Sequence, residues 1–435
     1  MSMSIVVRGA GSIVTLALAL VSVVLAGGCS DDDSTIQTDP YKATVQADPT
    51  LDDTTVIISG PYLHAPAEGT VTINWETAEP SSSRVELTPE GGAPEVVQGI
   101  VYQQVPSTDN ILLVGTPLET YAHEVILTGL VPGATYTYRV LSSAEQPTAR
   151  VVGPPAVGDG FSFVVFGDTR TNHAEHANVV DGILRQADVS DHPAFVINTG
   201  DLTNTGGNDG DWATFFEIEH PLISEVPLMA VFGNHDFLLG RTAFESYFQA
   251  PPTSTSTSDR YYSADIGNVH IVVIDVGSMT EEPQDQWVED SFAASTAPFK
   301  VATLHAPLYT NSNHSPSLIA RDTLGPIFEA QGVQVVFSGH NHCYERFLGY
   351  GSYFITTGGG GAPLYGVDDN PTVDNGDTVR EAAASAYNFL WVTTSETEMV
   401  LETFVSADAT TPVTESFDCF KVMAGEPVTA TIPCD

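Results

Sequence analysis

The stretch FSFVVFGDTR (residues 161–170) sets an apolar run directly against a glycine and Asp168. An uninterrupted run of this kind is typical of a strand that is buried on both faces. The same order recurs in AFVINTGD (residues 194–201), which ends in Asp201. Two buried strands that end in a carboxylate at the same offset indicate an α/β sheet, because such sheets bind ligands beyond the carboxyl ends of their strands.

The region around both runs alternates strand-like and helix-like segments. Further apolar runs of strand length lie at 228–232, 270–276, 300–304 and 333–338. Segments with apolar residues near helical spacing lie at 176–187, 211–223, 284–295 and 320–331, and strand-like runs return between 386 and 416. We therefore expect a domain over residues 158–408 in which central mixed sheets are flanked by helices.

The preceding segment, residues 54–152, has an all-β pattern. In TVTINWET (residues 70–77) the alternation places Val71, Ile73 and Trp75 on one face. Other short strands, broken by Gly and Pro turns, predict a β-sandwich. LTGLVPGATYTYRV (residues 127–140) also resembles the fibronectin type III pattern. No ligand constellation is visible in this domain, so we expect a structural or docking role.

Residues 1–28 read as a signal peptide, because Arg8 precedes an apolar run over residues 13–25. LAGGC, which ends at Cys29, resembles a bacterial lipobox with Ala26 in place of the usual leucine, so lipidation of Cys29 and ordinary cleavage both stay open. An acidic linker (29–53) follows, and residues 409–435 are interpreted as a C-terminal tail. We expect an exported protein, either a lipoprotein of the bacterial cell envelope or secreted, with the membrane reached only through that anchor.

The 435-residue chain carries a formal charge of −41, from 55 acidic and 14 basic residues. Contacts with nucleic-acid phosphates need Lys and Arg, so we do not expect a nucleic-acid-binding surface. An anionic substrate would need a strong local positive source. Export would permit disulfides, and Cys419 and Cys434 are close enough in sequence to pair, which would leave Cys343 free.

Five of the predicted strands end in side chains that bind metals. In chain order, these are Asp168, Asp201, Asn234 with His235, His305, and His340 with His342. A mixed set of carboxylate, amide and imidazole donors suits Zn, Fe or Mn better than Ca or Mg. The set is large enough for two metal ions if one carboxylate bridges them.

The order GD…GD…GNH…H…GHNH resembles that of the calcineurin-like metallophosphoesterases. GHNHCYER (339–346), TTGGGGAPLY (356–365) and the fibronectin-like leader narrow the resemblance to the purple acid phosphatase-like branch, from about Gly60 to Val405. The resemblance implies hydrolysis of a small phosphorylated substrate by a binuclear metal centre, as in an acid phosphatase-like phosphomonoesterase. A phosphodiesterase or nucleotidase on the same metals, and a cell-surface binding protein with a degenerate enzyme domain, remain as alternatives.

The resemblance also implies roles by position. Asp168 and His342 would hold the first metal, Asp201 would bridge, and Asn234, His305 and His340 would hold the second. His235 would lie beside the substrate phosphate as a donor. His314 falls where family members place a substrate-binding or proton-donating histidine, so His235 and His314 are the candidates for the acid that protonates the leaving group.

Two positions depart from the family pattern. Asn204 stands where purple acid phosphatases have a tyrosine ligand, and Arg170 stands where many other members have a histidine. Asn204 could ligate through its amide oxygen, His173 could fold back as a ligand, or the first site could be weak or completed by water. We expect Arg170 to contact the substrate phosphate or Asp168, and Arg346 to pair with an acid behind the site.

Overall fold

The computed structural model describes residues 42–45, 54–104, 120–239, 242–277, 279, 284–368, 378–406 and 411–434. These residues belong to one compact unit, Asp39–Asp435. The predicted signal peptide and Cys29 lie outside them, as does nearly all of the predicted linker. Among the helices described, none has both the length and the apolar character needed to cross a membrane.

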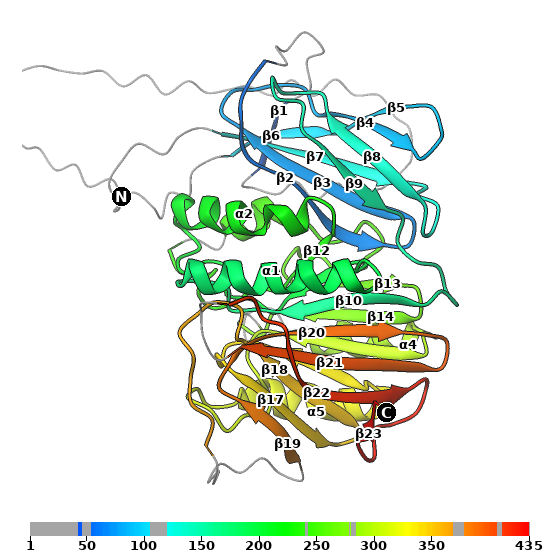
Figure 1. Ribbon diagram of the computed structural model, residues 1–435, viewed down its shortest axis with the longest axis vertical. Helices are drawn as coiled ribbons and strands as arrows, with labels where there is room; N and C mark the ends of the chain where they lie inside the picture. Colours follow the sequence, from blue (N-terminus) through cyan, green and yellow to red (C-terminus); the bar gives the residue numbers. More distant parts are fainter. Residues whose placement is uncertain are drawn as a thin grey trace, which may run out of the picture. The chain divides into compact units, whose positions relative to one another are not determined.

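The N-terminal domain is a sandwich of two antiparallel sheets (Figure 1). One sheet has the order β1 (Lys42–Val45), β6 (Ile100–Gln104), β7 (Thr120–Thr128), β3 (Thr70–Thr77), β2 (Ile57–Ala67). The other has the order β5 (Glu95–Gln98), β4 (Arg84–Pro89), β8 (Thr135–Val140), β9 (Thr148–Val152). Val71, Ile73 and Trp75 lie in the core between the sheets, as the alternation predicted.

The second domain has two mixed sheets. The first has the order β12 (Leu228–Ala230), β11 (Val196–Asn198), β10 (Phe161–Phe166), β20 (Tyr387–Thr394), β21 (Glu398–Ser406), β22 (Glu415–Met423), β23 (Ile432–Pro433). The second has the order β13 (Tyr262–Ile266), β14 (Val269–Ile274), β15 (Phe299–Leu304), β16 (Val335–Ser338), β18 (Ser352–Thr357), β17 (Tyr344–Gly349), β19 (Val379–Ala384). Strands β10 to β12 are parallel to one another, as are β14, β15, β16 and β18, while β20 runs antiparallel to β10.

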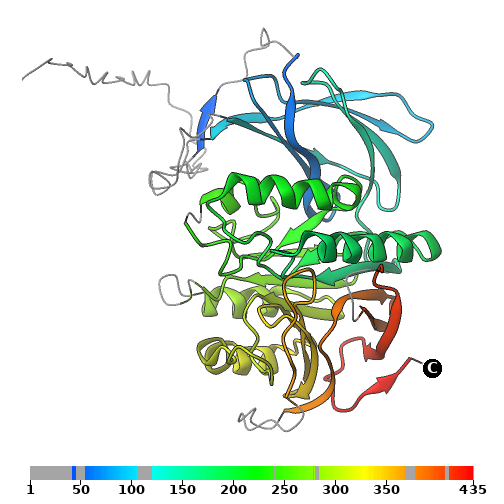
Figure 2. The same cartoon turned by 60° about the vertical axis from the view of Figure 1, so that its left-hand side comes forward.

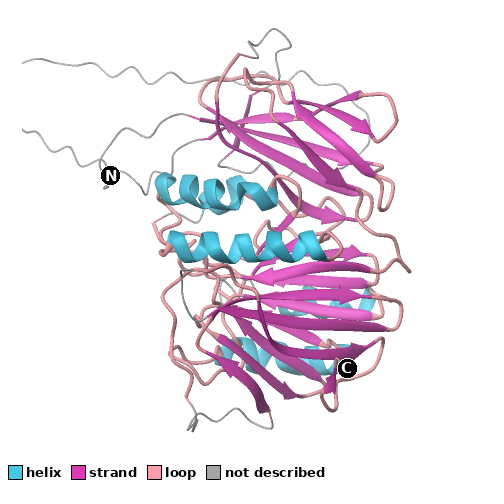
Figure 3. Ribbon diagram, viewed as in Figure 1, coloured by secondary structure: helices cyan, strands magenta, loops and turns pink. Residues whose placement is uncertain are grey.

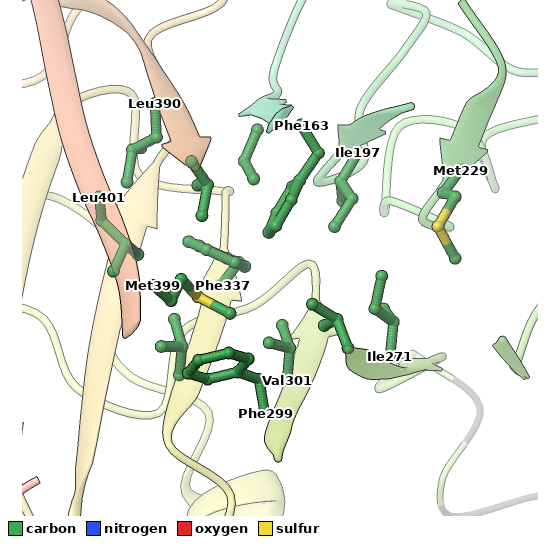
Figure 4. Close-up of a cluster of buried hydrophobic side chains, with 14 of the residues drawn as sticks. Phe163, Ile197, Met229, Ile271, Phe299, Val301, Phe337, Leu390, Met399 and Leu401 are labelled. Carbon is green, nitrogen blue, oxygen red and sulfur yellow. The ribbon is translucent and has the colours of Figure 1, made fainter. Parts of the chain in front are cut away.

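The two sheets pack face to face over one apolar core, part of which is shown in Figure 4. Phe163 and Ile197 of the first sheet meet Ile271, Val301 and Phe337 of the second there. The outer face of the first sheet packs in a second cluster with α1 (His173–Val189) and α2 (Asp209–Ile223). The outer face of the second sheet packs with α4 (Asp285–Ala294) and α5 (Leu318–Gln331). This confirms the predicted fold of a β-sandwich followed by mixed sheets flanked by helices.

Every helix of the described residues lies in the second domain, which Figures 2 and 3 show beside the strand-only sandwich. Local sequence explains where α5 begins and ends. The Ser317 hydroxyl accepts a hydrogen bond from the Ala320 backbone N–H, and Gly332 adopts a left-handed conformation (φ 69°) at the other end. A short helix, α3 (Thr242–Tyr247), completes the domain.

Hydrogen bonds join the two domains. Strand β2 pairs with β12 at His64 and Leu228, so the sandwich sheet continues into the first sheet of the second domain. The Tyr62 hydroxyl donates to the Tyr247 carbonyl (2.8 Å), and the buried Tyr138 hydroxyl donates to the Ser224 carbonyl (2.7 Å). The sandwich is therefore docked on the second domain through buried polar contacts, which accords with a structural role.

The C-terminal residues interpreted as a tail extend the second domain instead. Within 409–435, β22 pairs along β21 and continues its sheet past the predicted boundary at residue 408. In the pattern ESFDCFKVM, charged residues interrupt the apolar alternation, so the strand could not be recognised from sequence alone. The predicted disulfide Cys419–Cys434 is confirmed, with a Cα–Cα distance of 5.6 Å, and Cys343 is a buried free thiol.

Candidate metal centre

The strand ends bring the predicted ligands together from two sheets rather than from one edge of a single sheet. Asp168, Asp201 and Asn234 follow β10, β11 and β12 of the first sheet. His305 follows β15 of the second sheet, and His340 and His342 follow β16. Potential ligand atoms of Asp168, Asp201 and His342, all three buried, lie within 4.8 Å of one another. The site therefore forms where the edges of the two packed sheets meet.

Three of these residues have a strained backbone. Asp168 and Asp201 have φ of 56°, and His340 has φ of 68°, in the left-handed region that costs an L-residue about 1 kcal/mol or more. Neighbouring glycines allow the carboxylates to approach. A Cβ on Gly339 would collide with Asp168 Oδ2, and a Cβ on Gly233 would collide with Asp201 Oδ1. The local backbone is thus shaped around the two carboxylates.

The two carboxylate oxygens of Asp201 face different neighbours. Oδ1 accepts from the His235 backbone N–H (2.8 Å) and lies 3.2 Å from His305 Nε2. Oδ2 lies 3.2 Å from Arg170 Nε. Burial alone would raise the pKa of Asp201, but the charges of His305 and His235, that backbone donor and Arg170 lower it overall. The carboxylate is held ionised with one oxygen turned toward each half of the site.

Around Asn234, His305 and His340, side-chain atoms that can bind a cation converge beside Asp201. His305 Nδ1 lies 2.9 Å from the Thr199 carbonyl oxygen and therefore carries the proton in a neutral ring. Its Nε2 lone pair then faces Asn234 Oδ1 at 3.1 Å as well as Asp201 Oδ1. Burial would lower the pKa of His305, but the charges of Asp201 and Asp168 raise it overall, which shows how strongly this place attracts a positive charge.

The ring of His340 completes this half of the site. Its centroid lies 5.1 Å from that of His305. Burial and the neighbouring His305 and His314 lower its pKa to about 3, so the ring is neutral and its lone pair is available. Asn234, His305 and His340 can therefore hold a metal ion together with Asp201.

The other half of the site contains Asp168 and His342. His342 Nδ1 lies 2.7 Å from the Pro363 carbonyl oxygen, so its Nε2 presents a lone pair, 3.5 Å from Asp168 Oδ1. Asp168 Oδ1 is a buried oxygen without a hydrogen-bond partner. An orphaned carboxylate oxygen beside an imidazole lone pair fits a cation, because burying it unpaired is costly.

Arg170 lies on this first half of the site. Besides Asp201 Oδ2, its guanidinium approaches His342 Nε2 (NH2, 3.4 Å) and Asn204 Oδ1 (NH1, 3.4 Å). The guanidinium forms its ion pair with Asp201 rather than with Asp168, and the expected contact with the substrate phosphate stays a prediction. His173 does not fold back toward the site, because it is the exposed first residue of α1. Ligation by Asn204 stays a prediction.

His235 and His314 each lie next to a predicted ligand, His235 beside Asp201 and His314 beside His340. His235 Nδ1 is 2.7 Å from the Asn204 carbonyl oxygen, and Nε2 has no hydrogen-bond partner among the described residues. The His314 ring stacks on that of His340, with centroids 4.2 Å apart. Burial and the nearby His342 lower the pKa of His314. Both rings are only partly buried, so a substrate can reach them.

Sequence reasoning missed three residues that orient this site. Asn341 contacts the His314 segment, and Tyr365 stacks on His342 with centroids 4.0 Å apart. Buried Asp236 accepts from the backbone N–H groups of Leu202, Thr203 and Gly233. Asn341 stands between two predicted ligands and Asp236 follows the candidate acid His235, and that position is the only signal by which the sequence could have revealed them.

Comparisons with known proteins agree with this geometry. Residues 161–344 match the model of the calcineurin-like phosphoesterase family, and residues 60–153 match that of the purple acid phosphatase N-terminal domain. The chain is 33% identical over 242 residues to purple acid phosphatase 22 of Arabidopsis thaliana. The alignment covers 52% of this chain and 53% of that protein. It is 25% identical over 333 residues to acid phosphatase type 7 of Homo sapiens, which covers 68% and 72%.

The chain spans about half the length of several of these plant relatives. Among solved structures, a purple acid phosphatase from yellow lupin (Lupinus luteus) seeds superposes with a TM-score of 0.70 at 19% identity, over 83% of this chain and 74% of that one. PhoD superposes with a TM-score of 0.63 at 13% identity, over 88% and 92%. At such identities the structural likeness concerns the fold.

Proposed function

The chain belongs to the purple acid phosphatase-like branch of the calcineurin-like phosphoesterases, and on that premise we propose that it is a metal-dependent phosphomonoesterase. The observation that carries the proposal is the convergence of Asp168, Asp201 and His342, whose potential ligand atoms lie within 4.8 Å of one another, with a buried Asp168 oxygen that has no hydrogen-bond partner. Asp168 and His342 would hold one ion, and Asn234, His305 and His340 the other. The donor set suits Fe, Zn or Mn.

When bound, two metal ions would activate water and neutralise charge on a phosphoryl group. They would also supply the positive field that a chain of net charge −41 lacks. The protein's own contribution is to hold the ligands rigidly. Asp236 ties three backbone N–H groups of two ligand loops together, and the Pro363 and Thr199 carbonyls fix the orientation of His342 and His305.

His235 and His314 are the residues proposed to handle the proton of the leaving alcohol. The His235 ring is fixed through Nδ1–H on the Asn204 carbonyl, so its Nε2 would donate to a phosphate or alkoxide oxygen when the ring carries both protons. The His314 segment is held by Asn341, which places its ring against His340. Arg170, once free of Asp201, has the forked guanidinium that suits phosphate oxygens.

The direct test is hydrolysis by the metal-reconstituted protein. We expect turnover of p-nitrophenyl phosphate that is lost on chelation and restored by Fe, Mn or Zn, with at most weak turnover of bis-p-nitrophenyl phosphate. The reverse preference would favour a phosphodiesterase or nucleotidase, which the same metal ligands could serve. Absence of both activities with a metal-loaded centre would favour a surface binding protein with a degenerate enzyme domain.

The predicted leader and the excess of acidic residues motivate a proposal on location and partners. The protein is exported, is either lipid-anchored at Cys29 or secreted, and acts on a small phosphorylated molecule rather than on nucleic acid. Expression of the full chain and of Cys29→Ser in a bacterial host tests the anchor. Anchoring requires the full chain in the membrane fraction and the variant in the soluble exported fraction, whereas identical fractionation would contradict it.

A further inference from the structure

The guanidinium of Arg170 covers two atoms that the first metal site needs. Arg170 Nε lies 3.2 Å from Asp201 Oδ2, and NH2 lies 3.4 Å from His342 Nε2. Asp201 Oδ2 is the carboxylate oxygen turned away from His305, and His342 Nε2 is the lone pair left by its bond to Pro363. Both atoms are acceptors, and Arg170 donates to both.

A metal ion and the guanidinium cannot use these atoms together. Each is cationic, and two like charges at hydrogen-bond distance from the same carboxylate oxygen in a buried site repel strongly. The Arg170 side chain is only 12% exposed and that of Asp201 is 1% exposed, so water screens this repulsion poorly. Arg170 must therefore leave Asp201 Oδ2 and His342 Nε2 before a metal ion can bind them.

The second half of the site has no such competitor among the residues that the structure describes. There, the Arg170 side chain makes no hydrogen bond to Asn234, His305 or His340, and its ion pair uses the opposite oxygen of Asp201. The competition is thus restricted to the half of the site that contains Asp168 and His342.

Polar groups next to the site can also bind the guanidinium after it leaves the metal ligands. On the solvent side, Asn204 Oδ1 and Thr171 Oγ1 already lie 3.4 Å and 3.2 Å from Arg170 NH1, and both residues are exposed. Thr171 has a φ of 83°, so the backbone next to Arg170 is held in an unfavourable conformation that a rearrangement can relieve.

We propose that Arg170 is an internal competitor for the first metal ion: it occupies that site in the metal-poor protein and swings outward when the ion binds. The inference rests on the proposed metallophosphoesterase function and deepens it. The two sites then differ in metal affinity. The tight site is formed by Asn234, His305 and His340, and the weak, exchangeable site is formed by Asp168 and His342.

Calorimetric titration of Mn²⁺ or Zn²⁺ into metal-free protein, without substrate, tests this. We expect two classes of site in the wild-type protein. Arg170→Ala should tighten the weak class about ten- to a hundredfold, since it removes charge-assisted hydrogen bonds that metal binding must break, and should leave the tight class unchanged. Arg170→Lys should give an intermediate value. Arg185→Ala, which removes an exposed arginine paired with Asp181 on α1, is the matched control and should change neither class.

His342→Ala identifies the sites, because it should abolish the weak class and spare the tight one. Equal affinities in the wild-type protein, or weaker binding in Arg170→Ala with an unchanged circular dichroism spectrum, would overturn the inference. The titration is independent of turnover. An inactive protein that still shows the Arg170-dependent weak site would refute the proposed phosphomonoesterase and leave the competitor intact.

Discussion

Asn341 holds the backbone of His314 from both sides: its Oδ1 accepts from the His314 N–H (2.8 Å), and its Nδ2 donates to the His314 carbonyl (3.1 Å). Asn341 is completely buried and stands between two predicted ligands in GHNH. It therefore fixes the position of a proposed proton donor without approaching the substrate itself.

Asn341→Ala should lower kcat for p-nitrophenyl phosphate about tenfold, because His314 loses its alignment, while KM and metal content change little. Steady-state kinetics and metal analysis of the same preparation measure this. Asn313→Ala, in the exposed part of the same segment, is the control and should behave as wild type. A loss of bound metal in Asn341→Ala would instead assign Asn341 a role in building the metal site.

The residue at position 204 should determine whether the iron-loaded protein has a tyrosinate-to-iron absorption band. With Asn204 in place of the family's tyrosine, no phenolate is positioned for iron, so the wild-type protein should show no strong visible charge-transfer band. Asn204→Tyr should introduce one, and the visible spectrum after loading with iron measures it. A purple wild-type protein, or a variant that binds iron and stays colourless, would contradict this placement of Asn204 beside the first metal.

Arg346 holds the C-terminal strand to the second sheet, as expected for an arginine paired behind the site. Its Nε lies 2.7 Å from Asp418 Oδ2, NH1 pairs with Glu381, and the guanidinium lies over the ring of Phe420. Arg346→Met should destabilise the protein by about 3–5 kcal/mol, because the acids lose a largely buried partner. Urea unfolding measures this change.

Lys421→Met is the control for Arg346, since Lys421 lies in β22, the strand of Asp418, in a partly exposed pair with Glu398 (3.4 Å). The free energy of unfolding of that variant should fall by less than about 1 kcal/mol. Equal losses in the two variants would show that Arg346 contributes no more than a surface ion pair.

Glu76 makes the stability of the sandwich depend on pH. Burial, with a smaller contribution from Asp209, raises its pKa from 4.5 to about 7 in spite of the hydrogen bond from Thr120. The folded state thus holds the proton more strongly than the unfolded state. The stabilisation is fully present below pH 4.5 and is lost as the pH rises through 7, by at most about 3 kcal/mol.

Glu76→Gln should therefore raise the melting temperature at pH 8 and have little effect at pH 4.5. Melting curves of the wild type and the variant across this range measure the difference. Glu79→Gln, at an exposed position two residues past the end of β3, should leave the pH dependence unchanged. A variant less stable than wild type at pH 8 would mean that Glu76 is ionised and paired in the folded protein.

The elements and the order of the candidate ligands could be read from the sequence because both depend on local pattern. An apolar run such as residues 161–166 predicts a strand that is buried on both faces. A glycine followed by Asp168 predicts a sharp turn where the strand ends in a polar residue. The alternation of Val71, Ile73 and Trp75 reported the core face of the sandwich in the same way.

What the sequence could not reveal depends on partners that are distant in the chain. Periodicity identifies β10 and β16 as strands but does not say that they belong to different sheets. The ion pair of Arg170 with Asp201 depends on a side chain 31 positions away, and an equally good acid, Asp168, stood two residues from it. Strand β22 was missed because Glu415, Asp418 and Lys421 interrupt its apolar alternation.

The position of β10 in its sheet has a consequence for the order of assembly. This strand, which ends in Asp168, pairs on one side with β11 and on the other with β20, more than 200 residues later in the chain. A chain that is still being synthesised, or that is truncated before residue 387, lacks β20. One edge of β10 is then unpaired, and the strand that positions Asp168 is incomplete. Folding must wait for a late, long-range pairing, and slow formation of the site is expected from a topology of this kind. We therefore expect the candidate metal site to form only after almost the whole chain has been made.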